Sequence, residues 1–572
     1  MSKFYYNEEQ ESYDAIVVGT GISGGWAAKE LCEKGLKTLV LERGPMKKHR
    51  DDYPTANLDP WDLPNNGQLT RAQRARQEKQ IRTSYIGNTA HNFWFVDDIE
   101  HPYNETKRFE WHRGYHVGGR SVMWGRHSYR WSDIDFGANK NDGIAVDWPI
   151  RYKDIAPWYD KVEQFIGVTG ENLGLDVLPD GKFEPPFELN CSEQHLRDGL
   201  KEHYKDRHLT PGRVAHINSD KKFEGDGRIR CQSRNRCIRG CPFGGYFSSL
   251  SSTLPVAERT GNLTLRVDAI VSEVIYDPNT KKALGVKVVD AETKEEFEFK
   301  AKVIFLCAST VPTASILMQS KSERFPNGLG NDSDQLGRNI MDHHLGVGAR
   351  GKLAGYKDKY YKGRKPGGIY LPRFRNLGGT SNTNKFIRGY GYQGGGSRTN
   401  WEDSVAELSY GKNLKEAILK PGDWQFGMSG FGEILPYEDN RMTLNYDKKD
   451  NWGLPTVTFD AEFKENEINM RVDMMDQAVE MLTKAGFKDV EPYNDETYIG
   501  FGIHEMGTAR MGRDPRTSVV NGHNQVHACK NVYVTDGAFM TSASCVNPSL
   551  TYMAFTARAA NHAVQELKKG NI

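Results

Sequence analysis

Short hydrophobic runs at the start of the chain flank a helical pattern. Residues 13–18 form an apolar run that ends at Gly19, and a helical pattern follows at 26–31. A second apolar run, 37–41, ends at Glu42. Short apolar runs on either side of a helix are typical of buried parallel strands joined by a crossover. The pattern therefore predicts an α/β, Rossmann-like domain at this end of the chain.

Two later apolar runs, 263–267 and 303–308, are also predicted to be strands. The second run leads into a helical pattern at 312–319. Ligands of α/β sheets bind beside such strand-to-helix turns. We therefore expect Ala308, which lies in this turn, to contact a cofactor.

The pattern changes between 321 and 499. Alternating, aromatic-rich runs such as 424–431 favour an antiparallel sheet with one face over the cofactor. Five apolar positions further on have helical spacing and predict the packed face of one helix: Ile468, Val472, Met475, Val479 and Leu482.

These patterns predict a discontinuous cofactor domain and a second, antiparallel-sheet domain that holds the substrate. The cofactor domain is expected to comprise residues 1–45, 112–135, 225–320 and 500–572. The substrate domain is expected at 136–224 and 321–499. The polar segment 46–111 is predicted to be a lid or a partner contact.

Composition narrows the classes of function. The 76 basic residues nearly balance the 75 acidic ones, which argues against a nucleic acid as partner. No stretch of about 18 apolar residues occurs, so no transmembrane segment is expected. The first residues have neither the basic nor the apolar part of a secretion signal. Eight cysteines are too few for a disulfide scaffold, although three of them crowd into residues 231–241.

The loop after the first strand has the spacing of a dinucleotide-binding turn. Gly19 permits a tight turn, Gly21 lets the backbone approach a pyrophosphate, and Gly24 lets the helix pack against the strand. The start of the helix, which includes Ser23, presents N–H groups to the phosphates. Glu42 is placed to bind a ribose and would repel a 2′-phosphate. NADP is therefore disfavoured, while the loop alone leaves both NAD and FAD open.

A second glycine cluster, HRGYHVGGRSVMWG at 112–125, is followed by DWPI at 147–150 and LGRNIMDH at 336–343. The C-terminal part contains HEMGT at 504–508 and NPSLT at 547–551. In these motifs and in their order, the chain resembles the glucose–methanol–choline (GMC) oxidoreductase family over essentially its whole length.

The resemblance implies FAD, with its ADP half on the first loop and its isoalloxazine at the second glycine cluster. Asp536 and Gly537 would lie against the ribityl or pyrophosphate part. Met123 stands where some sugar-oxidising relatives carry a histidine that binds the flavin covalently, so non-covalent FAD is expected. The remaining residues implied in cofactor binding are Gly118, Gly119, Ser121, Trp124, Asn547 and Pro548.

His504 and Asn547 are the candidate catalytic residues. A neutral imidazole accepts a proton at working pH, and a carboxamide can hydrogen-bond the substrate oxygen. By likeness to the family, His504 is the base beside the flavin, and Asn547 stands where other members carry a second histidine. Structural roles are expected for His116, His343, His344 and His527.

Three cysteines, Cys231, Cys237 and Cys241, lie in the segment CQSRNRCIRGCPFG at 231–244. Three thiolates can bind a soft metal or a cluster, and a Cys-Pro pair is common in iron–sulfur loops. The interleaved arginines are expected to lower the thiol pKa values and to offset a cluster's charge. A zinc site with His216 as fourth ligand, and a disulfide with one free thiol, are the alternatives. The loop is similar to the cluster loop of bacterial sugar dehydrogenases, which implies a [3Fe–4S] cluster.

Together these features predict an FAD-dependent dehydrogenase that acts on CH–OH groups. The first choice is oxidation of a secondary hydroxyl of a sugar or glycoside, at C3 of a glucoside, with electrons leaving through the cluster. Glucose C1, gluconate or fructose dehydrogenation, an oxygen-using oxidase with structural cysteines, and a non-catalytic electron-relay flavoprotein are the alternatives. The resemblance implies a small accessory subunit and a cytochrome c-like acceptor. Export to the periplasm with that subunit is expected, with the cytoplasm as the alternative.

Overall fold

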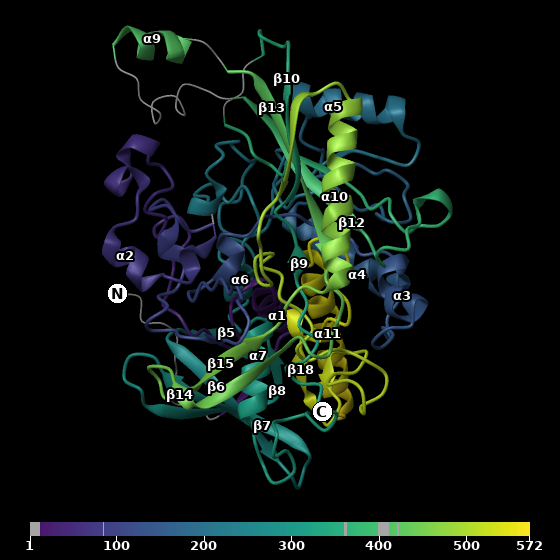
Figure 1. Cartoon of the computed structure of the whole chain (residues 1–572). Coiled ribbons are helices and arrows are strands. Elements are labelled where there is room, and N and C mark those ends of the chain that lie inside the picture. Colours follow the sequence, from purple (N-terminus) through teal and green to yellow (C-terminus); the bar gives the residue numbers. More distant parts are fainter. Residues whose placement is uncertain (1–11, 84, 360–362, 399–410, 420–421) are drawn as a thin grey trace.

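The computed structural model describes residues 12–83, 85–359, 363–398, 411–419 and 422–572. Two large sheets organise these residues, one at the lower end of the view in Figure 1 and one at the upper end. No helix in the described ranges is long and apolar enough to span a membrane.

The first sheet has the order β17-β18-β8-β1-β2-β5. In addition, β7 pairs with β8, and β6 pairs with β7. Its neighbours β5-β2-β1-β8-β18 are all parallel. β1 and β2 are buried almost throughout, as a sheet covered on both faces requires. The strands are β1 (Tyr13–Val18), β2 (Thr38–Leu41), β5 (Leu263–Arg266), β6 (Ala269–Asp277), β7 (Lys282–Asp290), β8 (Glu296–Leu306), β17 (Gln525–Val526) and β18 (Cys529–Val534).

Helices α1 (Ile22–Glu33), α6 (Thr253–Arg259), α7 (Thr310–Gln319) and α11 (Ser549–Lys569) accompany this sheet. α1 forms the crossover from β1 to β2 and packs against α6 and α11. α7 follows β8 and lies on β6. The predicted Rossmann-like domain is confirmed.

The second sheet is antiparallel, in the order β16-β10-β13-β12-β11-β4, and β9 pairs with β13. Helices α5 (Cys191–His203) and α10 (Glu465–Lys484) pack on it. This confirms the predicted antiparallel sheet. Its strands are β4 (Thr210–Pro211), β9 (His343–His344), β10 (Val347–Leu353), β11 (Ile369–Leu371), β12 (Tyr390–Arg398), β13 (Trp424–Glu433) and β16 (Lys488–Asn494).

The predicted packed face of α10 was wrong at its first two positions. Ile468 is 55% exposed and Val472 is 44% exposed. The stripe that faces β10 and β13 consists instead of Met470, Met474, Ala478 and Met481. Both stripes have helical spacing, and flexible methionine side chains fill the irregular space over this sheet.

Residues 46–111 contain the short helix α2 (Arg71–Arg76) and several 3₁₀ turns. Within this segment, β3 (Asn104–Glu105) joins β15 (Pro455–Asp460) and β14 (Arg441–Lys449) in a small third sheet. Among the described residues, the remaining α-helices are α3 (Asp133–Asp142), α4 (Tyr152–Ile166) and α9 (Lys412–Leu419). The domain boundaries themselves stay a prediction.

Candidate functional site

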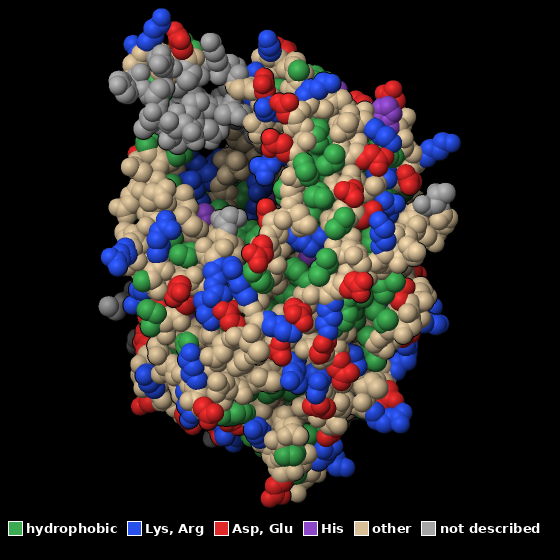
Figure 2. All heavy atoms as spheres, in the orientation of Figure 1, with side chains coloured by type: hydrophobic (Ala, Val, Ile, Leu, Met, Phe, Trp, Pro, Cys, Tyr) green, Lys and Arg blue, Asp and Glu red, His purple; other side chains and the backbone are tan. Residues whose placement is uncertain are grey.

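A cavity of ≈ 610 Å³ is lined by residues of both large sheets and of the segment 95–127. This volume lies in the range of cofactor and ligand sites, about 300–1,000 Å³. Figure 2 shows a hollow in the face of the molecule, with basic and histidine side chains in its wall.

The β1–α1 loop forms one wall of the cavity. Gly19 has φ +96°, and a Cβ on Gly24 would lie 1.9 Å from the carbonyl oxygen of Gly19. A Cβ on Gly21 would meet no protein atom within 4 Å, and Gly21 faces the cavity. α1 begins there with no side-chain cap and no acid in its first turn. Its free N–H groups and the open space at Gly21 fit a pyrophosphate.

Two alanine substitutions in this loop are expected to have opposite effects. Gly24→Ala forces backbone atoms apart and should destabilise the fold by about 1–3 kcal/mol. Gly21→Ala should leave the free energy of unfolding unchanged but lower the FAD content, because its methyl group occupies the phosphate space. Thermal unfolding of the apoprotein and the flavin-to-protein ratio measure the two effects. Equal loss of stability in both variants would contradict this account of the loop.

Glu42 borders the cavity at the end of β2, as expected for a ribose ligand. Its carboxylate accepts N–H bonds from Thr20 and Gly44, both at 3.1 Å, and a short bond from the Thr20 hydroxyl. Burial raises the pKa of Glu42, and the hydrogen bonds oppose that rise. The carboxylate is thereby held in a fixed orientation at the cavity edge.

The second glycine cluster packs directly on the first loop. The Gly118 N–H donates to Thr20 Oγ1 at 3.0 Å, and Gly118 and Gly119 both have positive φ. Met123 and Trp124 extend this wall of the cavity. Within 112–125, His116 lies outside the cavity wall, and His112 has both ring nitrogens bonded, to Thr83 Oγ1 and the Glu110 carbonyl. Non-covalent FAD stays a prediction. No histidine of 112–125 that lines the cavity has an unbonded ring nitrogen.

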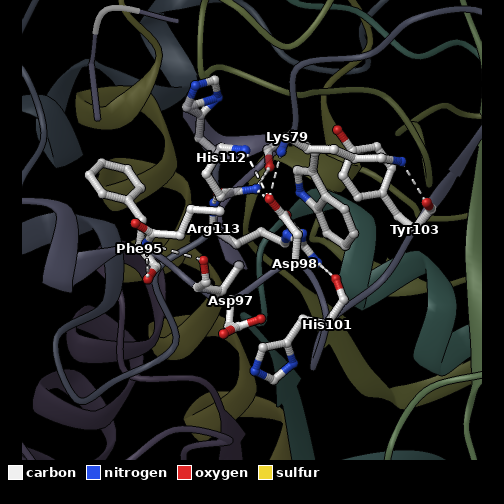
Figure 3. Close-up of polar contacts among 12 residues, drawn as sticks. Lys79, Phe95, Asp97, Asp98, His101, Tyr103, His112 and Arg113 are labelled. Carbon is white, nitrogen blue, oxygen red and sulfur yellow. Dashed lines mark hydrogen bonds and ion pairs between the residues drawn. The ribbon is translucent and has the colours of Figure 1, made fainter. Parts of the chain in front are cut away.

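The segment before this cluster is held over the cavity by a polar network (Figure 3). Arg113 pairs with Asp98 at 3.0 Å and donates to the His101 carbonyl at 2.5 Å. Lys79 donates to Asp98 through its backbone and to the Tyr103 carbonyl through Nζ. The network fixes His101 and Arg113, both of which line the cavity.

Most of the predicted cofactor residues line this one cavity, although they come from distant parts of the chain. Gly24, Gly118 and Pro548 do not line it. The lining residues are Gly19, Gly21, Ser23, Glu42, Gly119, Ser121, Met123, Trp124, Ala308, Asp536, Gly537 and Asn547. Asp536 accepts hydrogen bonds from Thr313 Oγ1 and the Ala538 N–H, and burial raises its pKa to about 6. The residues present therefore fit an FAD.

His504 and Asn547 line the same cavity, although they come from separate segments of the C-terminal part of the chain. Burial, with smaller effects from His343 and Arg120, holds the pKa of His504 well below its usual value of 6.5. The imidazole is therefore neutral at working pH and can act as a base. Asn547 Oδ1 accepts a hydrogen bond from Gln393 Nε2 at 2.6 Å.

Sequence reasoning missed two residues of the site. His343 Nδ1 lies 3.1 Å from His504 Nδ1, although only a structural role was expected for His343. Gln393 on β12 lines the cavity beside Asn547. The sequence separation hides both contacts, because each depends on how the antiparallel sheet is placed over the first domain.

Asp342, next to His343, is one of three residues whose ligand atoms gather within 4.8 Å, with His343 and His504. Its carboxylate already accepts N–H bonds from Gly500, Gly502 and His504. These bonds fix the backbone that carries His504. The grouping of Asp342, His343 and His504 is therefore explained without a metal ion.

The cysteine loop reaches the wall of the same cavity. Asn235, Cys237 and Ile238 line the cavity, and all three cysteines of the loop are free thiols. In the described ranges, the group of metal-ligand atoms within 4.8 Å of one another is that around Asp342, and not these three sulfurs. A single metal ion needs ligand atoms as close together as this, whereas an iron–sulfur cluster binds each cysteine sulfur through a different iron atom. The three sulfurs therefore do not form the close set of ligand atoms that one zinc ion needs.

The expected lowering of the thiol pKa was wrong for Cys231 and Cys241. Burial raises the pKa of Cys231 to about 11 and also raises that of Cys241, and the smaller effects of Arg126 and Arg234 do not reverse this. Metal binding must therefore displace protons from these thiols.

Cations surround the cysteine loop with few carboxylates to balance them. Arg236 pairs with Asp59, whereas Arg234 and Arg239 hydrogen-bond to Asn57 and to backbone carbonyls. Arg126 and Lys365 line the adjoining cavity wall and have no ion pair among the described residues. This excess of positive charge suits an anionic group such as a thiolate-bound cluster.

Comparisons with known proteins agree with this geometry. Family models described as GMC oxidoreductase match residues 216–345 and 436–556. The chain is 28% identical to a 2-methyl-1,2-propanediol dehydrogenase of Mycolicibacterium austroafricanum, covering 96% of this chain and 94% of the relative. It is 26% identical to a fructose dehydrogenase large subunit of Gluconobacter japonicus, covering 99% and 100%. The fold is similar to that of a formate oxidase of Aspergillus oryzae, with TM-score 0.61, 14% identity, and coverage of 98% and 100%.

Proposed function

We infer that this chain, which belongs to the GMC oxidoreductase family, oxidises a secondary hydroxyl of a sugar or glycoside to a ketone. Membership makes it an FAD-dependent enzyme that acts on CH–OH groups. The C3 hydroxyl of a glucoside is our first choice of substrate, supported by the likeness of the cysteine loop to that of sugar dehydrogenases.

The observation that carries this proposal is the meeting of His504 and Asn547 in the cavity of the glycine loops. His504, held neutral by burial, takes the hydroxyl proton. Asn547 hydrogen-bonds the substrate oxygen and orients the carbinol. FAD bound in this cavity supplies the acceptor for the hydride. Phe431 and Trp124 line the same cavity and give it aromatic walls beside His504 and Asn547.

The lowered pKa of His504 predicts a flat pH profile on the acid side. A group with a lowered pKa keeps its neutral form to lower pH. We expect the rate of flavin reduction at about pH 5.5 to lie within about twofold of that at about pH 7.5, whereas a base of pKa about 6.5 would lose about tenfold. Burial raises the pKa of Asp342 to about 7 and that of Asp536 to about 6. Asp342 accepts its hydrogen bonds from backbone N–H groups, and Asp536 from Thr313 and Ala538. Their titration should therefore change the rate less than protonation of the base itself would. Anaerobic stopped-flow measurements across this range give the answer, and a tenfold fall would contradict the lowered pKa.

We propose that Cys231, Cys237 and Cys241 hold a [3Fe–4S] cluster. The place of Cys237 at the cavity wall and the unbalanced cations around the loop support this. A cluster accepts electrons singly, so reduced enzyme could discharge to a protein acceptor. A small accessory subunit and a cytochrome c-like acceptor are the partners that we propose, and export with that subunit to the periplasm is the proposed location.

The proposed function is tested by anaerobic mixing of the purified protein with a panel of glycosides, free sugars and 2-methyl-1,2-propanediol. Bleaching of the flavin by glycosides is the expected result. A preference for the propanediol would assign a non-sugar alcohol instead. Iron and sulfide analysis on the same sample tests the cluster, and their absence together with rapid oxygen consumption would favour the oxidase alternative.

A further inference from the structure

We propose that His343 and Gln393 are positioning residues that fix which hydrogen-bonding groups His504 and Asn547 present to the cavity. A bound hydroxyl would then meet one acceptor, His504 Nε2, and one donor, the Asn547 amide. This inference rests on the proposed oxidation of an alcohol and extends it to two residues outside the reacting pair.

The backbone determines the proton position on His343. Its Nε2 lies 3.1 Å from the carbonyl oxygen of Ser544, which can only accept a hydrogen bond. Nε2 must therefore carry the proton, and burial keeps the ring neutral by lowering its pKa to about 3. The other nitrogen, Nδ1, is left as an acceptor.

The proton position on His343 in turn determines the proton position on His504. Because His343 Nδ1 is an acceptor, the His504 Nδ1 that lies 3.1 Å from it must donate. A neutral imidazole has one N–H, so His504 Nε2 keeps its lone pair. The ring of Phe431 lies 4.6 Å from that of His343 and 5.6 Å from that of His504, measured between centroids, and limits their rotation.

Gln393 has the corresponding role for Asn547. With Gln393 Nε2 donating to Asn547 Oδ1 at 2.6 Å, the Asn547 NH₂ group is free for the substrate oxygen. A donor is needed there, because negative charge grows on that oxygen as its proton leaves. An acceptor in its place would repel the oxygen.

The first experiment compares His343→Asn with His343→Leu. Both lose the bond to Ser544, but only the asparagine retains an oxygen that can accept from His504 Nδ1. We expect the limiting rate of flavin reduction to stay within about tenfold of wild type in His343→Asn and to fall by about 100-fold or more in His343→Leu. The substrate concentration at half-saturation should change by less than about threefold in both. Flavin content and thermal unfolding check that both variants fold.

Equal losses in the two variants would mean that His343 serves packing alone and would overturn its assignment. If the wild-type protein shows no flavin reduction with any alcohol, the proposed function fails, which is a different outcome. Should either His343 variant not fold, the decision passes to Gln393, whose side chain borders open cavity space.

The second experiment compares Gln393→Glu with Gln393→Met. An ionised glutamate accepts but cannot donate, so Asn547 would turn its NH₂ group toward residue 393. We expect the limiting rate of Gln393→Glu to fall by about 30-fold at about pH 8 and to recover by about tenfold toward pH 5.5, as the carboxyl regains its proton. Gln393→Met should lose activity without that recovery. Burial lowers the pKa values of His127 and His504, which also line the cavity, so neither titrates in this range. Asp536, another lining residue, has a pKa of about 6 and does titrate there. Gln393→Met retains Asp536 and therefore shows how much of the pH effect comes from that group.

Gln425→Glu is the matched control, because Gln425 lies exposed on the neighbouring strand β13 and does not line the cavity. Wild-type rates in Gln425→Glu would show that charge on the sheet alone has no effect. A rate for Gln393→Glu within about threefold of wild type at about pH 8 would overturn the assignment of Gln393, since Asn547 would then already donate to residue 393.

Discussion

Replacing His504 by alanine is expected to lower the rate of flavin reduction by about 10²–10⁴-fold, the usual contribution of a positioned general base. Among the described histidines that line the cavity, His504 is the one whose ring is hydrogen-bonded to a second histidine, His343, which is in turn bonded to the Ser544 carbonyl. The flavin should remain bound, because the glycine loops and Glu42 do not depend on His504. Anaerobic stopped-flow absorbance measures the rate, and the visible spectrum measures the flavin content.

His527→Ala is a suitable control for this substitution. His527 is half-buried, hydrogen-bonded to Ser518, and absent from the cavity wall. It should retain wild-type rates of reduction. If His504→Ala bleached as fast as wild type, proton removal would have to be assigned to another group.

The second large effect is expected from the cysteine loop. Serine at Cys231, Cys237 or Cys241 removes one ligand of the proposed cluster and should prevent its assembly, because the natural number of protein ligands for [3Fe–4S] is three. Turnover with a one-electron protein acceptor should then fall by about 100-fold or more, while reduction of the flavin by substrate stays within about threefold. Iron content, paramagnetic resonance and cytochrome c reduction distinguish the two half-reactions.

Cys191→Ser provides the matched control for the loop. Cys191 is also a partly exposed free thiol, at the start of α5. It should retain iron and turnover. Full iron content in all three loop variants would exclude the cluster from these cysteines and return the loop to a structural role.

The sequence was most informative where function constrains the backbone. Gly19 and Gly24 identify the cofactor loop in the sequence, because no side chain fits at those two positions. Ala308 follows from its place after an apolar strand. Periodicity was a weaker guide for α10, since two stripes have helical spacing and only the shape of the sheet decides between Ile468 and Met470.

The hydrogen-bond partners of the site could not be predicted in this way. His343 looked structural because its neighbour His504 is 161 residues away and the contact forms only in three dimensions. Gln393 belongs to a glycine-rich strand with no recognisable motif, and it reaches Asn547 only because β12 lies over the cavity. The raised pKa values of Cys231 and Cys241 result from burial. The arginines in the loop sequence predict the opposite shift, and the sequence does not show how deeply the thiols are buried.

The central claim is that an alcohol loses its proton and hydride in the cavity shared by the glycine loops, His504 and Asn547. One anaerobic titration tests it: the wild-type protein with methyl glucoside, followed by the flavin absorbance and by NMR of the product. We predict stoichiometric bleaching and a new ketone on the sugar ring. Bound flavin that stays oxidised with every glycoside and alcohol offered, or a protein that carries no flavin, would contradict the account.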